Sequence, residues 1–307
     1  MSTFKVTDLT DVRVAVIGGS GLYHLDNLTY LGDVNPETPW GFPSAPIHVC
    51  ETAAKQKVAF LSRHGKGHVF LPHELPFRAN IAALKAIGCQ VILAFSACGS
   101  LREEIAPEDF ILVSQLIDRT KGIRPSTFFG DGMAAHVMFA DPFSPVLSSI
   151  IADENKKQGI VKLHENKCLV CMEGPAFSTR AESHLYRSWG CDVINMTAIP
   201  EAKLAKEAEI EYQMINMATD YDCWRESEEA VSVEAVIRHL TNNASSAKKL
   251  AEALIPRIES ELANPDSALS KKVKADAGSS KGAVITAPDQ RNKETAGKLN
   301  FMLHGYF

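Results

Sequence analysis

The sequence predicts an α/β protein: a single domain in which a central mixed β-sheet is flanked by helices. Between residues 77 and 261, short apolar runs of strand length alternate with segments whose apolar residues recur at helical spacing. The composition, with 45% apolar and 22% charged residues, is that of an ordinary globular protein. A chain of 307 residues allows one large or two small domains, and the unbroken alternation favours one.

Charge and cysteine content exclude several classes of function. The net charge is −5 and no long basic run occurs, which argues against nucleic acid or an acidic lipid surface as the main partner. No run reaches the roughly 20 apolar residues that cross a bilayer, and the first apolar run is too short for a secretory signal. The seven cysteines are therefore expected to be reduced thiols. Cys168 and Cys171 have C-x-x-C spacing, but they lie in a strand-like run that favours core packing.

The first half of the chain contains three kinds of segment. The apolar run Val12–Ile17 predicts a buried strand, since Gly18-Gly19-Ser20-Gly21 closes it. From there to Pro46 we expect loop or irregular hairpin. The nearly all-apolar run Gln90–Ser96 predicts a central strand. Further strands are expected at Lys57–Ser62 and Phe110–Ile117, and a helix at Phe77–Ile87.

The second half repeats the alternation. Ser144–Gly159 predicts a helix with Ser144 as N-cap, Pro145 in the first turn and Gly159 as the stop. Ser232–Glu261 predicts a long helix with Ser232 as N-cap. The remaining expected elements are strands at Cys168–Met172, Val193–Met196 and Tyr212–Thr219, and helices at Arg180–Gly190 and Pro200–Glu209.

The composition changes after the main body of the domain, which spans about residues 12–262. Residues 264–298 are rich in Ser, Asp, Lys and Ala and contain few large apolar side chains, so we expect a flexible surface insertion or mobile loop. The tail 299–307 is apolar and aromatic. We expect it to dock on the body or on a neighbouring subunit.

Two strand ends indicate the kind of ligand. Val193–Thr197 ends in Asn, Met and Thr, whereas Ala218–Trp224 carries Asp220 and Asp222 at spacing i, i+2. Ligands of open α/β sheets bind at the carboxyl ends of strands. If both ends meet, carboxylates can accept from a ligand's N–H groups beside a hydroxyl for its oxygens. This pairing suits a nucleoside next to an anion, although a single Asp after a strand is often only a cap or a turn former.

Two glycine-containing segments are candidates for the anion. Gly18–Gly21 invites a dinucleotide-binding interpretation, but a Pro- and Gly-rich stretch follows where that motif needs a helix. The alternatives are a tight turn or, through Ser20, one wall of an anion pocket. Ser62–His68 directly follows a strand, and it contains Arg63, a planar fork of donors, and His64, a further donor. The alternative here is a solvated loop.

Two further strand ends are ambiguous alone. Ser96–Ser100 consists of small residues that let backbone N–H groups approach a ligand, but equally allow close packing. Phe177, in Glu173–Ser178, can stack on a planar base, although a lone Phe is more often part of the core. No cluster has the spacing of a metal site, and neither a nucleophile elbow nor a P-loop occurs, so we expect no metal and no cofactor.

Taken together, the segments resemble one family over about residues 12–249, with seven motifs in the family's order. The motifs are Gly-Gly-Ser-Gly, Ser-Arg-His-Gly, Phe-Arg-Ala-Asn, Ala-Cys-Gly-Ser-Leu-Arg, Glu-Gly-Pro-Ala-Phe-Ser, Val-Ile-Asn-Met-Thr and Ala-Thr-Asp-Tyr-Asp-Cys-Trp. The chain resembles the eukaryotic methylthioadenosine phosphorylases, a branch of the trimeric purine nucleoside phosphorylases. The likeness ends after residue 262.

The resemblance implies a site and an assembly. It places phosphate at Ser20, Arg63, His64, Ser96, Ala97 and Thr197, and the nucleoside at Phe177, Met196, Asp220, Tyr221 and Asp222. It assigns substrate preference to Ser178 and Val233, and contact with a neighbouring subunit of a homotrimer to His136 and, by position in the tail, to Leu303. It also implies a cytoplasmic location, with the nucleus as a second.

Asp220 is the residue expected to choose the base. A carboxylate accepts from the 6-amino group of adenine, whereas a 6-oxo purine would leave a buried acceptor unpaired. Relatives that act on 6-oxopurines carry Asn at this position and a His near the 5′-hydroxyl. Here the matching stretch, 231–236, is mainly apolar, which suits a methylthio group.

The implied reaction is phosphorolysis of S-methyl-5′-thioadenosine to adenine and 5-methylthioribose 1-phosphate, a step of purine and methionine salvage. Phosphate is the nucleophile and co-substrate, and Asp220 either transfers a proton to the purine or only hydrogen-bonds to it. Three alternatives remain: a nicotinamide-dependent oxidoreductase that uses Gly18–Gly21, a purine-binding protein without activity, and a hydrolase.

Overall fold

The computed structural model describes the chain except for residues 1–3, 10, 20–24, 26 and 226–232, and except for the side chains of residues 7, 233–238 and 240. Its strands are β1 Val14–Gly18, β2 Thr29–Val34, β3 Ile47–Glu51, β4 Lys57–Ser62, β5 Val91–Ser100, β6 Phe110–Arg119, β7 Leu163–Met172, β8 Val193–Asn195 and β9 Glu211–Asp220. Its α-helices are α1 Phe77–Ala86, α2 Pro145–Gln158, α3 Arg180–Ser188, α4 Ala198–Glu207, α5 Val233–Ala263, α6 Ala268–Asp276, α7 Ser279–Gly282 and α8 Lys293–Leu299. Short 3-10 helices lie at Val6–Asp8, Asp222–Trp224 (η2) and Pro288–Gln290.

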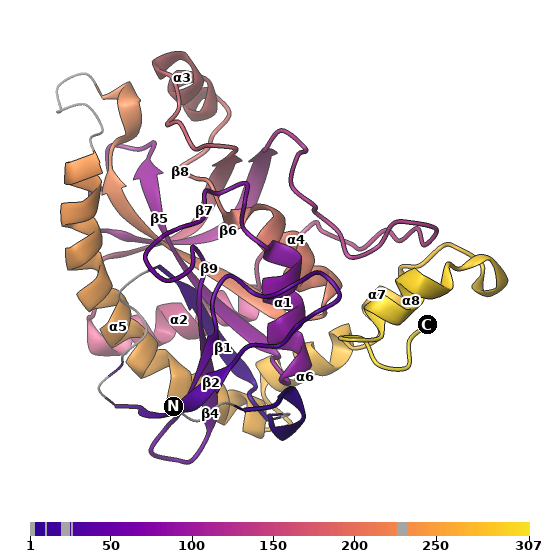
Figure 1. Ribbon diagram of the computed structural model, residues 1–307. Coiled ribbons are helices and arrows are strands. Elements are labelled where there is room, and N and C mark those ends of the chain that lie inside the picture. The colour runs from indigo at the N-terminus through magenta and orange to yellow at the C-terminus, as the bar shows by residue number, and fades with distance from the viewer. Residues whose placement is uncertain (1–3, 10, 20–24, 26, 226–232) are drawn as a thin grey trace.

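The strands of the described chain form one mixed sheet in the order β2-β3-β4-β1-β5-β8-β7-β6-β9. β9 also pairs with β5 in parallel, so the strands from β5 to β9 close on themselves like a small barrel. β1 is parallel to both β4 and β5, whereas β3 is antiparallel to its two neighbours, β2 and β4. The predicted mixed sheet with flanking helices is confirmed (Figure 1).

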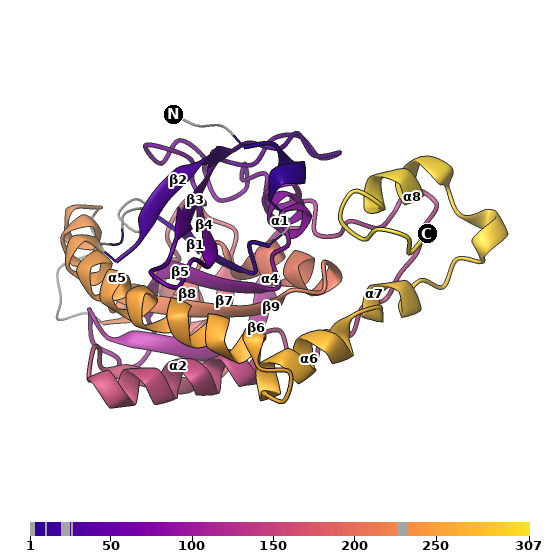
Figure 2. The ribbon, with the colours of Figure 1, turned by 90° about the horizontal axis from the view of Figure 1, so that it is seen from below.

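Helices cover the sheet on both faces. α1 and α4 pack together on one side, and α2, α5 and α6 pack on the other, as Figure 2 shows. Each side has its own apolar cluster: Leu84 and Leu204 belong to the first, and Leu147 and Leu254 to the second. The strands β1, β5 and β9 are buried from both faces, which explains why their sequences read as nearly continuous apolar runs.

Local sequence explains the ends of α2. The Ser144 hydroxyl accepts from the N–H of Leu147, Pro145 occupies the first turn, and Gly159 has the left-handed φ of 61° that ends the helix. These predictions are confirmed. The strand β3 was not predicted. It pairs with β2 through a register shift between Tyr30 and Gly32, where the extra residue lies in β2 and interrupts the alternation of that strand. The predicted N-cap Ser232 lies outside the described residues.

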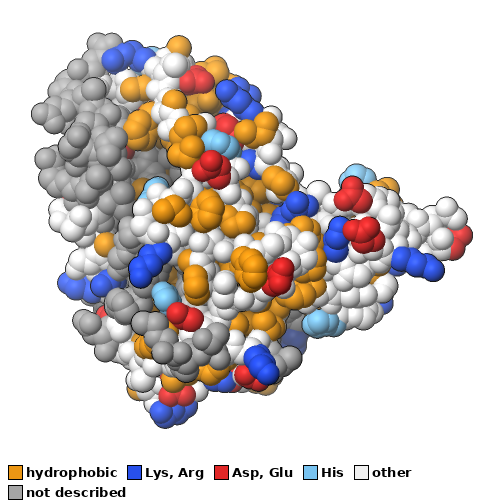
Figure 3. Space-filling model, viewed as in Figure 1, with side chains coloured by type: hydrophobic (Ala, Val, Ile, Leu, Met, Phe, Trp, Pro, Cys, Tyr) orange, Lys and Arg blue, Asp and Glu red, His pale blue; other side chains and the backbone are white. Residues whose placement is uncertain are grey.

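The prediction of a loop at 264–298 is wrong for most of that segment, because α6, α7 and α8 lie within it. Together with residues 120–143, residues 277–307 form the projection that carries α7, α8 and the C-terminus in Figure 1 and that stands out from the surface in Figure 3; we call it the arm. The two segments of the arm are joined by backbone hydrogen bonds: the N–H of His136 donates to the carbonyl of Ala283, and the N–H of Ile285 donates to the carbonyl of Ala134. The tail docks within the arm, as Leu299, Met302 and Leu303 are buried in the chain's own apolar cluster.

Glutamates at the end of α4 fix the arm to the body. Glu207 accepts from the N–H of Phe128 and the hydroxyl of Thr127, both at 2.7 Å. Glu209 accepts from the backbone N–H groups of Gly278 and Ser280 and from the hydroxyl of Tyr306. No helix in the described part of the chain is both long and apolar enough to cross a bilayer.

Candidate functional site

The predicted site residues converge on one cavity of about 290 Å³, formed where strands end. Arg63 and His64 follow β4, Ser96–Gly99 form the last part of β5, and Thr219 and Asp220 end β9. Of the sequence-predicted residues, those that line it are Arg63, His64, Ser96, Ala97, Phe177, Ser178, Met196, Thr197, Asp220 and Asp222. The strand-end hypothesis is therefore confirmed in its main point: the two polar runs meet.

They meet for a reason that the sequence did not reveal. β9 runs parallel to β5, but β8 runs antiparallel to the end of β5, with Ile194 opposite Gly99. The chain leaving β8 therefore returns along β5, which brings Thr197 to within 3.4 Å of Ser96, oxygen to oxygen. Gly99 keeps this approach close, because a Cβ there would lie 3.0 Å from Ile194 and 3.1 Å from a carboxylate oxygen of Asp220, so that these neighbours would have to shift.

The anion side of the cavity has a charge balance that we did not expect. Arg63 is only 2% exposed, and its Nε and Nη2 donate to the two carboxylate oxygens of Glu201 at 2.7 and 2.8 Å. The planar fork that was expected to bind an anion is thus turned toward Glu201. The ion pair carries no net charge, so anion binding here depends on the direction of N–H groups more than on net attraction.

His64 is placed differently from the expected additional donor. Its Nδ1 lies 2.9 Å from the carbonyl oxygen of Phe70, which can only accept, so Nδ1 carries the proton. Burial lowers the pKa of His64 to about 4, assisted by the nearby charge of Arg63. At neutral pH the ring is therefore uncharged and Nε2 is an acceptor. The ring also stacks on His68 at 4.1 Å.

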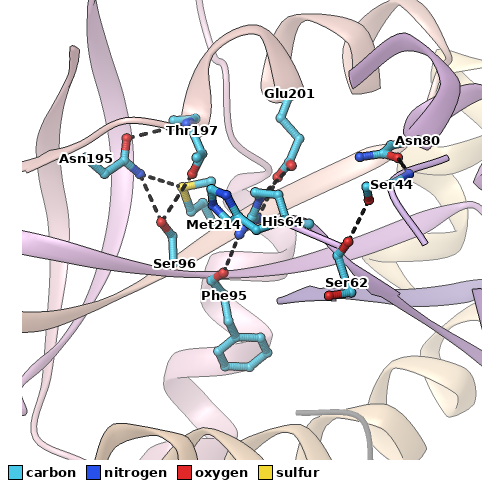
Figure 4. Close-up of polar contacts among 12 residues, drawn as sticks. Ser44, Ser62, His64, Asn80, Phe95, Ser96, Asn195, Thr197, Glu201 and Met214 are labelled. Carbon is cyan, nitrogen blue, oxygen red and sulfur yellow. Dashed lines mark hydrogen bonds and ion pairs between the residues drawn. The ribbon is translucent and has the colours of Figure 1, made fainter. Parts of the chain in front are cut away.

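Hydroxyl groups complete the anion side (Figure 4). The hydroxyls of Ser96 and Thr197 face each other, and the amide nitrogen of Asn195 lies 3.4 Å from the Ser96 oxygen. The Asn195 side-chain oxygen accepts from the N–H of Ala198, which fixes the turn that carries Thr197. The arrangement offers several rotatable donors within one small volume, which suits an oxyanion.

The carboxylates lie on the opposite side of the cavity. Asp220 accepts from the Asp222 N–H at 2.8 Å and from the Thr219 hydroxyl at 2.7 Å. Burial raises the pKa of Asp220, and the negative charge of Asp222 adds to this, while the two hydrogen bonds act against it. A raised pKa increases the fraction of Asp220 that is protonated, and the protonated carboxyl can donate a proton to a ligand.

Asp222 is fixed by two serines. Ser178 donates to both of its oxygens at 3.0 and 3.1 Å, and Ser183 donates to one at 2.5 Å. Asp222 has a φ of 51°, a conformation that Asp tolerates better than most residues. The predicted specificity residue Ser178 therefore contacts the cavity and also orients a carboxylate.

Apolar side chains border the space between these two sides. Phe177 is 49% exposed at the rim, where its ring is accessible for stacking. Met196 lies against Gly174, where a Cβ would approach the Met sulfur to 2.5 Å, so only glycine fits. The guanidinium of Arg124 donates to the carbonyls of Met196 and Ile199 and forms a buried ion pair with Glu173. This contact fixes the backbone that presents Met196.

Some predicted residues lie elsewhere or outside the description. Tyr221 is not brought into the cavity, since it alternates with its two Asp neighbours and packs against Arg225 instead. Ser20 lies outside the described residues, and so does the side chain of Val233, the first residue of α5.

His136 and Leu303 belong to the arm. His136 is exposed and lines a second cavity of about 510 Å³ between arm and body, so it can meet another chain. Leu303, in contrast, is 2% exposed and packs within its own arm, so it offers little surface to a neighbour.

Several lining residues were missed. Thr219 and Asn195 lie within quoted motifs, and His68 follows Gly67 in the segment after β4. For His68, the available indication was the glycine-containing segment in which it lies. Ser183 gave none, because its role depends on α3 packing over η2. Among the described residues, no three His, Cys, Asp or Glu side chains group as metal ligands.

Comparison with known proteins agrees with this geometry. Residues 13–256 match the model of the phosphorylase superfamily. The S-methyl-5′-thioadenosine phosphorylase of Yarrowia lipolytica is 52% identical, over 96% of this chain and 94% of its own length. That of Emericella nidulans is 51% identical, over 100% of this chain and 87% of its own.

Solved structures agree as well. A methylthioadenosine phosphorylase from an Antarctic soil metagenomic library has a TM-score of 0.86 at 42% identity, covering 96% of this chain and 99% of that one. The methylthioadenosine phosphorylase of Schistosoma mansoni in complex with adenine has a TM-score of 0.83 at 32% identity, covering 90% and 100%. Sequence, cavity and likeness thus agree that the chain belongs to the phosphorylase superfamily, among its methylthioadenosine phosphorylases.

Proposed function

We propose that the chain catalyses phosphorolysis of S-methyl-5′-thioadenosine to adenine and 5-methylthioribose 1-phosphate. The observation that carries the proposal is a single cavity with hydroxyl and guanidinium groups on one side and two carboxylates, the half-buried Asp220 and the buried Asp222, on the other. Family membership supports it, because the relatives carry that activity in their names. A phosphate oxygen bonds to C1′ as the C1′–N9 bond breaks, and the electron pair of that bond goes to adenine.

The protein's contribution is positioning and a proton source. Ser96, Thr197 and Arg63 hold phosphate below the sugar, and the Nε2 lone pair of neutral His64 accepts from a protonated phosphate oxygen. Asp220 donates to N7 of the leaving purine, which burial of its carboxyl favours. No residue forms a covalent intermediate and no cofactor takes part, since phosphate is the nucleophile.

Asp222 completes recognition of the base in this proposal. Its carboxylate is fixed by Ser178 and Ser183, and it accepts from the 6-amino group beside Asp220. A 6-oxo purine would present an acceptor to this pair of carboxylates, and the mispairing would disfavour it.

One experiment separates the alternatives. Adenine release from S-methyl-5′-thioadenosine is measured with and without inorganic phosphate, with inosine as a second substrate. We expect release only with phosphate, and little or none from inosine. Release that ignores phosphate would indicate a hydrolase, and no release would indicate a binding protein.

We also propose that the active form is a homotrimer. The arm presents two exposed apolar side chains, Met138 at 83% and Ile285 at 67%. The exposed His136 lies between them where the two segments of the arm pair. Such a surface is typical of a subunit contact. Sedimentation equilibrium tests the assembly: a monomer at micromolar concentration would contradict it.

A further inference from the structure

The buried carboxylate of Glu201 is the most informative group that the proposed reaction leaves unused. Glu201 is 1% exposed and lies near the start of α4, four residues after Thr197. Its two oxygens accept from Nε and Nη2 of Arg63, while Nη1 of Arg63 donates to the carbonyl of Phe95 at 2.8 Å. Figure 4 shows Glu201 pointing from its helix toward the anion side of the cavity.

A third residue fixes Glu201 itself. The hydroxyl of Tyr212, on β9, donates to Oε1 of Glu201 at 2.8 Å, and Tyr212 is 3% exposed. Burial and the negative charge of Glu201 raise the pKa of Tyr212 well above its ordinary value, so the hydroxyl stays a donor. The guanidinium is therefore held by groups from β5 and α4, and its carboxylate partner by β9.

This network lies directly behind the anion side of the cavity. Arg63 lines the cavity beside Ser96 and Thr197, whereas Glu201 and Tyr212 do not reach it. A guanidinium carries its donors in one rigid plane, so its orientation decides where they point. Without Glu201 a buried cation would lose its counter-charge and the group that sets its plane.

We infer that Glu201, supported by Tyr212, is a positioning residue for the anionic co-substrate, acting through the plane of the Arg63 guanidinium. The inference rests on the proposed function, in which the anion is phosphate. It assigns a role in phosphate binding to a residue outside the cavity. The nucleoside half of the cavity, around Asp220 and Phe177, is not part of this network.

The chain offers a matched control. Arg124 and Glu173 form a second buried ion pair with a similar N–O distance of 2.6 Å and side-chain exposures of 1% and 7%. Arg124 does not line the cavity, and its carbonyl contacts face the segment of Met196. Replacing either Glu by Gln removes one carboxylate from one buried Arg. The pairs differ in location and in their further contacts, since Glu173 also accepts from the N–H of Lys121 and Glu201 from the hydroxyl of Tyr212.

The test compares Glu201→Gln and Glu173→Gln with the unmodified protein, using KM for inorganic phosphate, KM for S-methyl-5′-thioadenosine, and Tm with and without phosphate. We expect Glu201→Gln to raise the phosphate KM about 10-fold or more, as loss of an oriented charge-assisted hydrogen bond does, and to leave the nucleoside KM within about 2-fold. It should also reduce the rise in Tm that phosphate gives. Glu173→Gln should lower Tm and raise the nucleoside KM through the segment of Met196, but leave the phosphate KM within about 2-fold.

Tyr212→Phe keeps the ion pair and removes one hydrogen bond, so it decides the question if Glu201→Gln does not fold. We expect it to raise the phosphate KM about 3-fold without changing the nucleoside KM. An unchanged phosphate KM in the folded variants, or an equal rise in Glu173→Gln, overturns the inference. Failure of the proposed function is recognised separately, because the unmodified protein would then release no adenine in response to phosphate.

Discussion

The cavity-bearing body and the arm are built by different means. In the body, strands buried on both faces fix the backbone, and side chains at their ends are placed by the sheet itself. In the arm, short helices and a paired loop contribute Phe129, Met133 and Leu303 to the edge of the apolar cluster that covers one face of the sheet. The body thus has long apolar runs that specify its structure locally, whereas the arm depends on contacts between segments more than 130 residues apart.

Replacing Asp220 tests the body most directly. We expect Asp220→Asn to lower kcat/KM for S-methyl-5′-thioadenosine by about 10²–10³-fold, because the general acid is lost from the purine side. Activity on inosine should rise from its low base, since an amide can donate to a 6-oxo group. Tm should change little, as Asn can keep one of the two hydrogen bonds. Full activity on the 6-amino substrate with none gained on inosine would contradict this role.

The corresponding test of the arm is Leu303→Ala. The side chain is 2% exposed, and we expect the variant to lower the free energy of unfolding by about 2–3 kcal/mol through the cavity it leaves. Hydrogen exchange locates the effect. Amides of residues 277–307 should lose protection while those of β5 and β9 keep it, if the arm opens as a unit of its own. Equal loss of protection in both regions would show that arm and body unfold together.

The contrast also explains what sequence could predict. β5, α2 and the capping residues Ser144 and Gly159 were predictable because their causes lie within a few neighbouring residues. Tyr221 was misplaced because a motif does not reveal which way alternate side chains point. Glu201 and Ser183 were missed because each acts on a partner distant in sequence, Arg63 and Asp222. The arm's helices were missed since residues 264–298 carry little apolar periodicity of their own.

The junction of the two regions responds to pH through Glu207. Burial raises the pKa of Glu207 from 4.5 to about 7, against the effect of its hydrogen bonds from Phe128 and Thr127. A raised carboxyl pKa contributes stability that is complete below about pH 4.5 and is lost as pH rises through 7. We therefore expect the stability of Glu207→Gln relative to the unmodified protein to rise by about 1–3 kcal/mol between pH 5 and pH 8.5, because the amide does not ionise. At pH 5 the variant should be the less stable of the two, since its amide nitrogen faces one of the two donors of the arm.

Chemical denaturation at the two pH values measures this difference. Glu209→Gln is the control in which no gain with pH is expected. Glu209 accepts from two backbone N–H groups and a hydroxyl of the arm, so an amide there loses at least one of these hydrogen bonds at either pH. That variant should be less stable than the unmodified protein at both pH values. A Glu207→Gln variant whose relative stability does not rise between pH 5 and 8.5 would contradict the assignment.

Ser183→Ala probes the finest level of placement in the body. Ser183 is fully buried on α3, and its hydroxyl donates to Asp222 without being part of the cavity lining. Ser178 still holds both oxygens of that carboxylate, so we expect only about a 3–5-fold rise in the nucleoside KM, with the phosphate KM unchanged. Ser188→Ala is the matched control and should change neither constant, because Ser188 is an exposed serine on the same helix and its hydroxyl donates to the Leu185 carbonyl. A change in the phosphate KM of Ser183→Ala would mean that the two sides of the cavity are coupled through α3, and would end the separation between phosphate and nucleoside networks on which the roles of Glu201 and Asp222 are argued.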